Sequence, residues 1–159
     1  VENDALFDAL ETGVVKRYIT DFGTEELLNK PNVTVFPHVG GSTGEAELNC
    51  AIMAAQTIRR FMETGEIVNS VNFPRVQQVL SAPYRITLIN KNVPNIVARI
   101  STAVSDFNIN IDNIINRSKG EYAYTLLDLD ETDKSKIDEL VAKFEASDNI
   151  VRVRLIKGK

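Results

Sequence analysis

Residues 84–107 read YRITLINKNVPNIVARISTAVSDF and contain the pattern on which the fold depends. Tyr84 to Ile89 alternates apolar and polar side chains, as a strand with one buried face does. Pro94 suits the first turn of a helix, where its missing N–H is no loss. The helix that follows has an apolar face at Ile96, Val97, Ile100, Val104 and Phe107. This stretch is therefore predicted to be a strand followed by an amphipathic helix.

The alternation of strand and helix continues to the end of the chain. Residues 109–115 and 122–129 are strand-like, and a Lys-Gly turn separates them. Thr132 is a candidate N-cap for a second helix, whose apolar face is Ile137, Leu140, Val141 and Phe144. Residues 151–155 alternate as a last strand. The order βαββαβ predicts a ferredoxin-like α+β sandwich.

The first half of the chain has shorter elements of mixed α/β type. Asn3 is a candidate N-cap for a helix that ends at Gly13, and strands are expected at 14–20 and 33–36.

A long helix is predicted to start at Ser42 or Thr43 and to run to about Glu63, followed by an extended segment at 67–73. Its apolar residues form two stripes, so we expect it to pack on two sides, between larger bodies of which one is missing from this chain. Cys50 lies in the second stripe and is interpreted as a small buried hydrophobe rather than a nucleophile.

The stretch between Pro74 and Pro83 has no clean period and is interpreted as a linker. The expected organisation is a first part at 1–75, a linker at 76–83 and a second domain at 84–159.

Composition limits the classes of partner. The 159 residues suffice for one ordinary domain or two small ones, and the net charge of −4 argues against nucleic acid and anionic membrane. No apolar run approaches the roughly 20 residues of a membrane span, and no signal peptide is visible. The single cysteine excludes an internal disulfide and favours a cytoplasmic location. Because the chain starts with Val1 rather than methionine, we expect it to begin inside a longer or processed gene product.

His38 is the only histidine, so any imidazole chemistry depends on it. It follows a predicted strand and precedes Gly40-Gly41, and strand ends that open into a cleft often carry functional groups. An imidazole is the side chain best suited to acid–base work near neutral pH. By position alone, a surface or helix-capping histidine is the alternative.

Three motifs carry a resemblance to a known family. Residues 36–46, FPHVGGSTGEA, resemble the T-P-H-[ILV]-G-[GA]-S-T-x-E-A signature of the D-isomer-specific 2-hydroxy-acid dehydrogenases. Residues 69–74, NSVNFP, resemble the N-x-V-N-x-P segment of the phosphoglycerate dehydrogenase branch, and residues 4–13 resemble its x-A-L-x-x-A-L-x-x-G helix.

The resemblance implies that residues 1–75 are the C-terminal remnant of a Rossmann-type dehydrogenase, with parts of its nucleotide-binding and substrate domains. It also implies a role for each matching residue. His38 would be the proton donor and acceptor at the substrate C2 oxygen, and Glu26 its paired carboxylate. Glu25 remains open as that carboxylate, and solvated loop acids are the alternative for both. The nicotinamide end of NAD would approach Asp21, His38, Val39, Gly40 and Gly41.

The chain has no G-x-G-x-x-G fingerprint, and the family's catalytic arginine would precede Val1. We therefore expect most of the NAD site to lie upstream and the isolated chain to have no dehydrogenase activity. Another 2-hydroxy acid as substrate stays open. No metal site is expected.

Residues 90–98, NKNVPNIVA, resemble the turn of ACT regulatory domains, and residues 108–111 resemble the start of their second strand. The resemblance implies an amino-acid effector, such as L-serine, at Asn90, Asn92 and Asn110. A dimerisation module without effector is the alternative for this half. A homodimer or larger oligomer is expected, and a free-standing amino-acid-sensing module is the second hypothesis for the whole chain.

Overall fold

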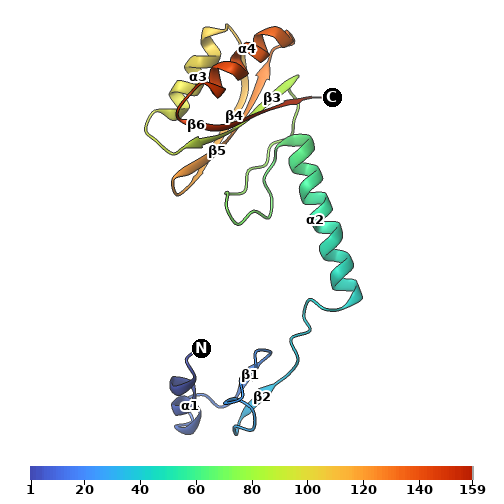
Figure 1. Cartoon of the computed structure of the whole chain (residues 1–159), viewed down its shortest axis with the longest axis vertical. Helices are drawn as coiled ribbons and strands as arrows, with labels where there is room; N and C mark the ends of the chain where they lie inside the picture. The colour runs from blue at the N-terminus through green and yellow to red at the C-terminus, as the bar shows by residue number, and fades with distance from the viewer. Residues whose placement is uncertain (159) are drawn as a thin grey trace. The chain divides into compact units, whose positions relative to one another are not determined.

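The computed structural model describes residues 1–158 and divides into two compact units, Val1–Ile52 and Met53–Lys159. Figure 1 labels the elements of both units. Among the described helices, none combines the length and the apolar character needed to cross a membrane.

The second unit has the predicted βαββαβ order. Its elements are β3 (Tyr84–Lys91), α3 (Ile96–Asp106), β4 (Asn110–Lys119), β5 (Tyr122–Asp130), α4 (Lys134–Glu145) and β6 (Ile150–Lys157). The four strands form one antiparallel sheet in the order β4-β5-β3-β6. The ferredoxin-like prediction is confirmed, and the chain as a whole is mixed α/β.

One face of the sheet packs against both helices (Figure 1). The alternating residues Tyr84, Ile86 and Leu88 of β3 lie on this face. They contact a core that also contains Ile100, Val104, Leu127, Leu129, Ile137, Leu140 and Phe144. Each such side chain contributes about 1.5–3 kcal/mol on burial, so this core is the main source of stability in the unit.

The other face of the sheet is covered in part by residues 65–83, which we call the strap. Ile67 and Val76 pair through backbone hydrogen bonds of 2.8 and 3.0 Å and pack on Tyr124 and Leu126. Val76 is only 1% exposed. The strap begins at Gly65, whose φ of +69° and close approach to the Thr87 methyl exclude a larger residue. The predicted linker at 76–83 is thus packed against the sheet.

Arg85 and Asp128 are cross-strand partners on this second face, and both are buried, at 0% and 1% exposure. The guanidinium donates to both carboxylate oxygens, at 2.5 and 2.7 Å. Its remaining N–H groups donate to the carbonyls of Thr64, Gln78 and Val79. All five donors of Arg85 are used, and the guanidinium holds both ends of the strap to the sheet.

The first unit contains α1 (Asn3–Glu11) and two short parallel strands, β1 (Tyr18–Thr20) and β2 (Val33–Val35). Only Leu6 and Leu27 among its hydrophobic residues are buried. The predicted strand at 14–20 is shorter than expected because the chain bends at residues 14–16 and becomes extended only at Tyr18.

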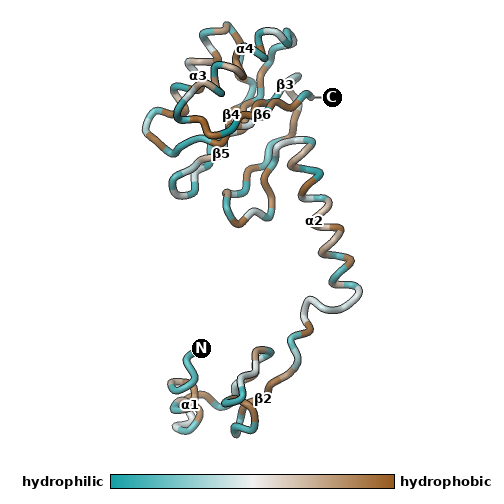
Figure 2. Tube along the Cα trace, viewed as in Figure 1, coloured by the Kyte–Doolittle hydropathy of each residue, from teal (hydrophilic) through white to brown (hydrophobic). Residues whose placement is uncertain are grey.

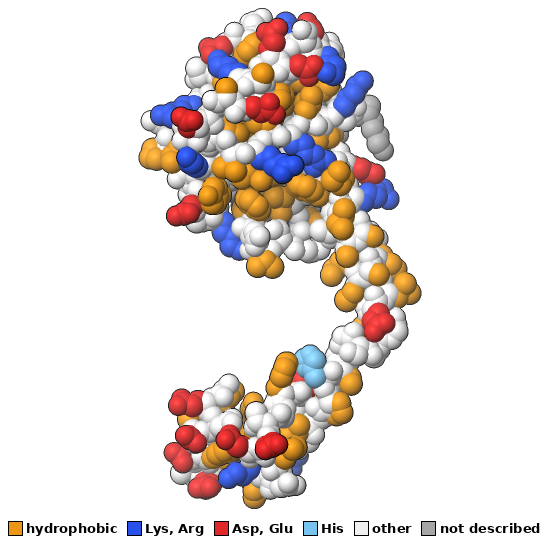
Figure 3. Space-filling model, in the orientation of Figure 1, with side chains coloured by type: hydrophobic (Ala, Val, Ile, Leu, Met, Phe, Trp, Pro, Cys, Tyr) orange, Lys and Arg blue, Asp and Glu red, His pale blue; other side chains and the backbone are white. Residues whose placement is uncertain are grey.

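The long helix α2 (Gly44–Thr64) crosses the boundary between the units. Thr43 caps it by accepting the Ala46 N–H at 3.1 Å, as predicted. No residue of α2 is buried, and hydrophobic side chains are uncovered along it (Figure 3). Figure 2 shows hydrophobic and hydrophilic residues interspersed over its length. Cys50 is exposed rather than buried. The packing of α2 between two larger bodies stays a prediction.

Three capping predictions were displaced by one or two residues. Glu2, not Asn3, is at the N-cap of α1. Asp133, not Thr132, caps α4 by accepting the Ser135 N–H at 2.9 Å, because the carboxylate competes better for the amide. Pro94 lies before α3 rather than in its first turn, since Asn95 adopts a left-handed φ of 63° at the N-cap.

Candidate functional site

A tight turn after β1 places Asp21 beside β2. Thr20 Oγ1 accepts the Phe22 N–H at 3.0 Å and fixes the start of the turn. A Cβ on Gly23 would lie 2.5 Å from a methyl of Val35, so glycine is required where the turn passes β2. The parallel pairing of Thr20 with Val35 brings the residues after both strands to the same edge.

His38 lies at that edge, three residues after β2. Its Nδ1 is 2.7 Å from Asp21 Oδ2, and the imidazole is 60% exposed. The Phe22 ring is tilted against it, with centroids 4.6 Å apart. With Asp21 ionised, Nδ1–H donates to the carboxylate and Nε2 is left as the basic nitrogen. The arrangement is an oriented, accessible imidazole capable of proton transfer.

The expected carboxylate partner is not the one in the structure. Glu26 Oε2 accepts a hydrogen bond from Asn3 Nδ2 at 2.6 Å, which ties the loop to α1. Within residues 1–158, neither Glu25 nor Glu26 forms a hydrogen bond with His38. Asp21, assigned from the sequence only to the cofactor, occupies the partner position.

The backbone after His38 is open. A Cβ built on Gly40 or Gly41 would meet no atom within 4 Å, and Val39 is 52% exposed. A planar ring could therefore approach this backbone closely, as the predicted nicotinamide contact requires. Within the described part of the chain, no group of three or more acidic, cysteine or histidine side chains could hold a metal ion.

The three predicted effector residues have different environments. Asn90 is fully buried, and its Oδ1 accepts the Thr125 hydroxyl at 2.8 Å. Thr125 Oγ1 in turn accepts a hydrogen bond from Asn116 Nδ2 at 2.7 Å. Asn92 is exposed, donating its N–H to the Glu121 carbonyl and its Nδ2 to the Gly120 carbonyl.

Asn110 is exposed at the opposite end of the sheet from Asn92. Asn110 pairs with Asp130 on β5, whereas Lys91, next to Asn92, pairs with Tyr122 at the start of β5. This separation corresponds to on the order of 25 Å along the strand. One copy of the sheet therefore does not bring the two asparagines together.

The N-terminus of α3, beside Asn92, has no side-chain cap. The other two long helices of this part of the chain are capped, α2 by Thr43 and α4 by Asp133. The Ile96 N–H donates to the Val93 carbonyl at 3.4 Å, and no side chain caps the N–H groups that follow it, which could meet an anionic group.

Sequence reasoning missed the residues that hold the end of α2. Arg154 donates to the carbonyls of Phe61, at 2.8 Å, and Met62, and its guanidinium stacks 5.0 Å from the Phe61 ring. Tyr124 Oη donates to the Gly65 carbonyl at 2.7 Å, and burial raises the pKa of its phenol. A charged residue inside an otherwise apolar strand, as at Arg85, was the signal available in the sequence.

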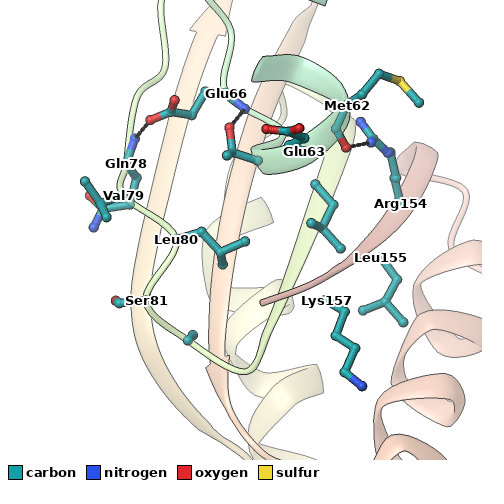
Figure 4. A pocket seen from close by; sticks show the side chains of 13 residues that line it. Met62, Glu63, Glu66, Gln78, Val79, Leu80, Ser81, Arg154, Leu155 and Lys157 are labelled. Carbon is teal, nitrogen blue, oxygen red and sulfur yellow. Dashed lines mark hydrogen bonds between the residues drawn. The ribbon is translucent and has the colours of Figure 1, made fainter. Parts of the chain in front are cut away.

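A pocket of about 740 Å³ lies between the last turn of α2, the strap and β6 (Figure 4). Three of its charged groups, Glu63, Glu66 and Arg154, already have partners. Arg154 reaches the Met62 carbonyl, and Glu66 accepts the Gln78 N–H at 2.8 Å and pairs with Arg60 at 3.7 Å. We interpret this pocket as part of the joint between α2 and the sheet.

Comparison with known proteins gives consistent relatives, although no family model matches the chain. The chain is 33% identical over 139 residues to D-3-phosphoglycerate dehydrogenase 2 of Saccharomyces cerevisiae, which covers 84% of this chain and 29% of that protein. It is 26% identical over 133 residues to D-3-phosphoglycerate dehydrogenase of Escherichia coli, and the match covers 84% of this chain and 32% of that protein. The chain spans less than a third of the length of these two relatives. Among solved structures, the ACT domain from GTP pyrophosphokinase of Chlorobium tepidum aligns with a TM-score of 0.42 at 18% identity, covering 46% of this chain and 95% of that domain.

Proposed function

We propose that this chain, a relative of the D-3-phosphoglycerate dehydrogenases over 84% of its length, forms the C-terminal part of such an enzyme. The full protein would oxidise D-3-phosphoglycerate to 3-phosphohydroxypyruvate with NAD in the cytoplasm, at the entry to L-serine biosynthesis. Residues 1–75 would complete the catalytic body, 76–83 would connect it, and 84–159 would form an ACT regulatory domain. The observation that carries the proposal is the His38–Asp21 contact of 2.7 Å, directly before an open Gly-Gly backbone.

In this proposal, His38 removes the proton from the C2 hydroxyl of the substrate through Nε2. Asp21 holds Nδ1–H, fixes the tautomer and stabilises the imidazolium that forms. NAD supplies the hydride acceptor when bound. The backbone of Val39, Gly40 and Gly41 would contact its nicotinamide end, where no Cβ blocks close approach.

The paired carboxylate can be tested on the 159-residue chain itself, since it contains a single imidazole. The ¹⁵N spectrum of that ring reports which nitrogen is protonated. Asp21→Asn should change the tautomer populations, whereas Glu26→Gln, the matched control, should leave them as in the wild type. A spectrum that responds to Glu26→Gln and not to Asp21→Asn would return Glu26 to the partner position.

Catalysis is tested in the full gene product. His38→Gln should lower kcat by roughly 10²- to 10⁴-fold, the usual contribution of a general acid–base group. Full activity of this variant would refute the proposed role of His38. The isolated 159-residue chain should show no oxidation of D-3-phosphoglycerate.

We further propose an amino-acid effector, with L-serine as the first candidate, bound between two copies of the regulatory domain. The uncapped N-terminus of α3 suits a carboxylate, and the amide oxygens of Asn92 and Asn110 suit an ammonium group. Because these two asparagines lie at opposite ends of one sheet, a shared site needs Asn110 from a second copy. Light scattering should give a dimer or larger oligomer, and calorimetric titration with L-serine should give heat; a monomer without heat would contradict this part.

A further inference from the structure

Thr125 connects the side-chain amides of buried Asn90 and half-buried Asn116 through one hydroxyl group. Its Oγ1 donates to Asn90 Oδ1 at 2.8 Å and accepts from Asn116 Nδ2 at 2.7 Å. Asn90 Nδ2 then donates to the Lys91 carbonyl at 3.0 Å. The chain of hydrogen bonds therefore runs from β4 through β5 to the last residue of β3, directly before Asn92.

This network lies in an environment where polar groups are costly. Asn90 and Thr125 are both fully buried, and Thr125 is the cross-strand partner of the core residue Leu88. A buried amide without partners is strongly destabilising, so each member fixes the orientation of the next. Within residues 1–158, no buried side-chain nitrogen or oxygen lacks a partner. The network is complete, and its geometry is determined by the single hydroxyl of Thr125.

The two ends of the network have different surroundings. Asn116 is half-buried on β4, an edge strand of the sheet, and Asn90 precedes the loop 91–95 that carries Asn92. Two backbone hydrogen bonds hold the loop itself. The Asn92 N–H donates to the Glu121 carbonyl at 2.8 Å, and the Val93 N–H donates to the Lys91 carbonyl at 3.0 Å. The Lys91 carbonyl is thus shared by the network and the loop.

We propose that Thr125 is a positioning residue for the effector loop. It holds Asn90 in place through Oδ1, and Asn90 holds the Lys91 carbonyl from which the loop 91–95 starts. Asn90 then supports the loop rather than contacting the ligand, and Asn92 is the contact residue on β3. This inference rests on the proposed amino-acid site, which it deepens by separating a supporting asparagine from a binding one.

The test compares two buried threonines of the 159-residue chain. Thr125→Val removes the hydroxyl, so Asn90 Oδ1 loses its donor and Asn116 Nδ2 loses its acceptor. Thr87→Val is the matched control, because Thr87 is 4% exposed on the neighbouring strand and faces the strap. Thr125→Ser retains the hydroxyl. Hydrogen exchange of the amides in 91–95 should accelerate about tenfold in Thr125→Val, as loss of one buried hydrogen bond allows, and stay as in the wild type in the other two.

Asn116→Ala keeps the test decisive if Thr125→Val fails to fold, since it interrupts the network from the half-buried end. Exchange in β5 serves as the internal reference for global unfolding. Unchanged loop exchange in the folded members of this pair overturns the inference.

Titration with L-serine separates the two proposals. If the wild type gives no heat with L-serine but loop exchange is still accelerated in the variants, the proposed effector is wrong and the positioning role of Thr125 is supported. Equal serine affinity and equal loop exchange in wild type and variants defeat the positioning role alone.

Discussion

The two units differ in how their functional groups are supported. In Val1–Ile52, Leu6 and Leu27 are the buried hydrophobic residues, while Phe22 is 71% exposed and Leu48 60% exposed. In the second unit, a continuous core lies on one face of the sheet and the strap packs on the other. Burial of apolar side chains must offset the conformational entropy lost on folding. The second unit buries many such side chains, whereas the first buries two. The proposed acid–base site therefore lies in the weakly supported unit and the proposed effector site in the well-supported one.

The largest expected effect follows from dividing the chain. Residues 53–159 alone should unfold in a single cooperative transition, because the unit has its own core, whereas residues 1–52 alone should show none. The measurement is circular dichroism against urea for both pieces and for the whole chain. The whole chain should unfold at nearly the same midpoint as residues 53–159. A cooperative transition in residues 1–52 would remove the contrast between the units.

The buried ion pair should give the next largest effect. Arg85→Met leaves Asp128 buried and unpaired and should cost about 3–5 kcal/mol of unfolding free energy in urea. The double variant Arg85→Met/Asp128→Leu should recover much of that loss, since apolar replacement of both partners is often neutral. Arg59→Met is the control, because Arg59 pairs with Glu63 at the surface and should cost less than about 1 kcal/mol. An equal loss in both single variants would show that Arg85 does not hold the strap.

The fold of the second unit could be predicted because its signals are local. Strand alternation from Tyr84 to Ile89 and the helical spacing of Ile137, Leu140 and Phe144 are visible within a few residues. The strap could not be predicted in this way. It depends on Arg85 meeting Asp128, 43 residues away in sequence, and on Ile67 pairing with Val76 across a segment without periodicity.

The candidate acid–base site was predicted in part. His38 followed from being the only imidazole and from the motif around it. Its carboxylate partner depends on the turn after β1, which Gly23 and Thr20 shape through contacts with β2 and with the turn itself. A motif alignment without gaps contains no information about that turn, so it favoured Glu26 over Asp21.

Truncations of single leucines sharpen the comparison within the helices. Leu140→Ala on α4 should cost about 2–5 kcal/mol, because Leu140 is fully buried. Leu48→Ala on α2 should stay within about 0.5 kcal/mol, because that side chain is 60% exposed and contributes little in this chain. Urea unfolding of both variants checks the difference. A large loss from Leu48→Ala would mean that the apolar stripe of α2 is covered in solution.

The smallest expected effect concerns the turn between β5 and α4. Glu131 accepts the N–H groups of Thr132 and Asp133 and pairs with Lys136 at 3.0 Å. The Asp133 N–H, the Lys136 ammonium and the Thr132 N–H together lower the pKa of Glu131 from 4.5 to about 2. Because the pKa is lower in the folded state, the ionised carboxylate stabilises the fold above about pH 4.5, and that contribution is lost as the pH falls toward 2.

Glu131→Gln should therefore be slightly less stable than the wild type at neutral pH, and the two stability curves should converge as the pH falls from about 4.5 to 2. Thermal unfolding at a series of pH values measures both curves. Glu139→Gln on the exposed side of α4 is the control, since Glu139 forms no salt bridge within residues 1–158, and its curve should run parallel to that of the wild type. A constant difference in stability between Glu131→Gln and the wild type down to pH 2 would show that ionisation of the Glu131 carboxyl does not stabilise the fold. The well-supported unit would then owe none of its acid sensitivity to this residue.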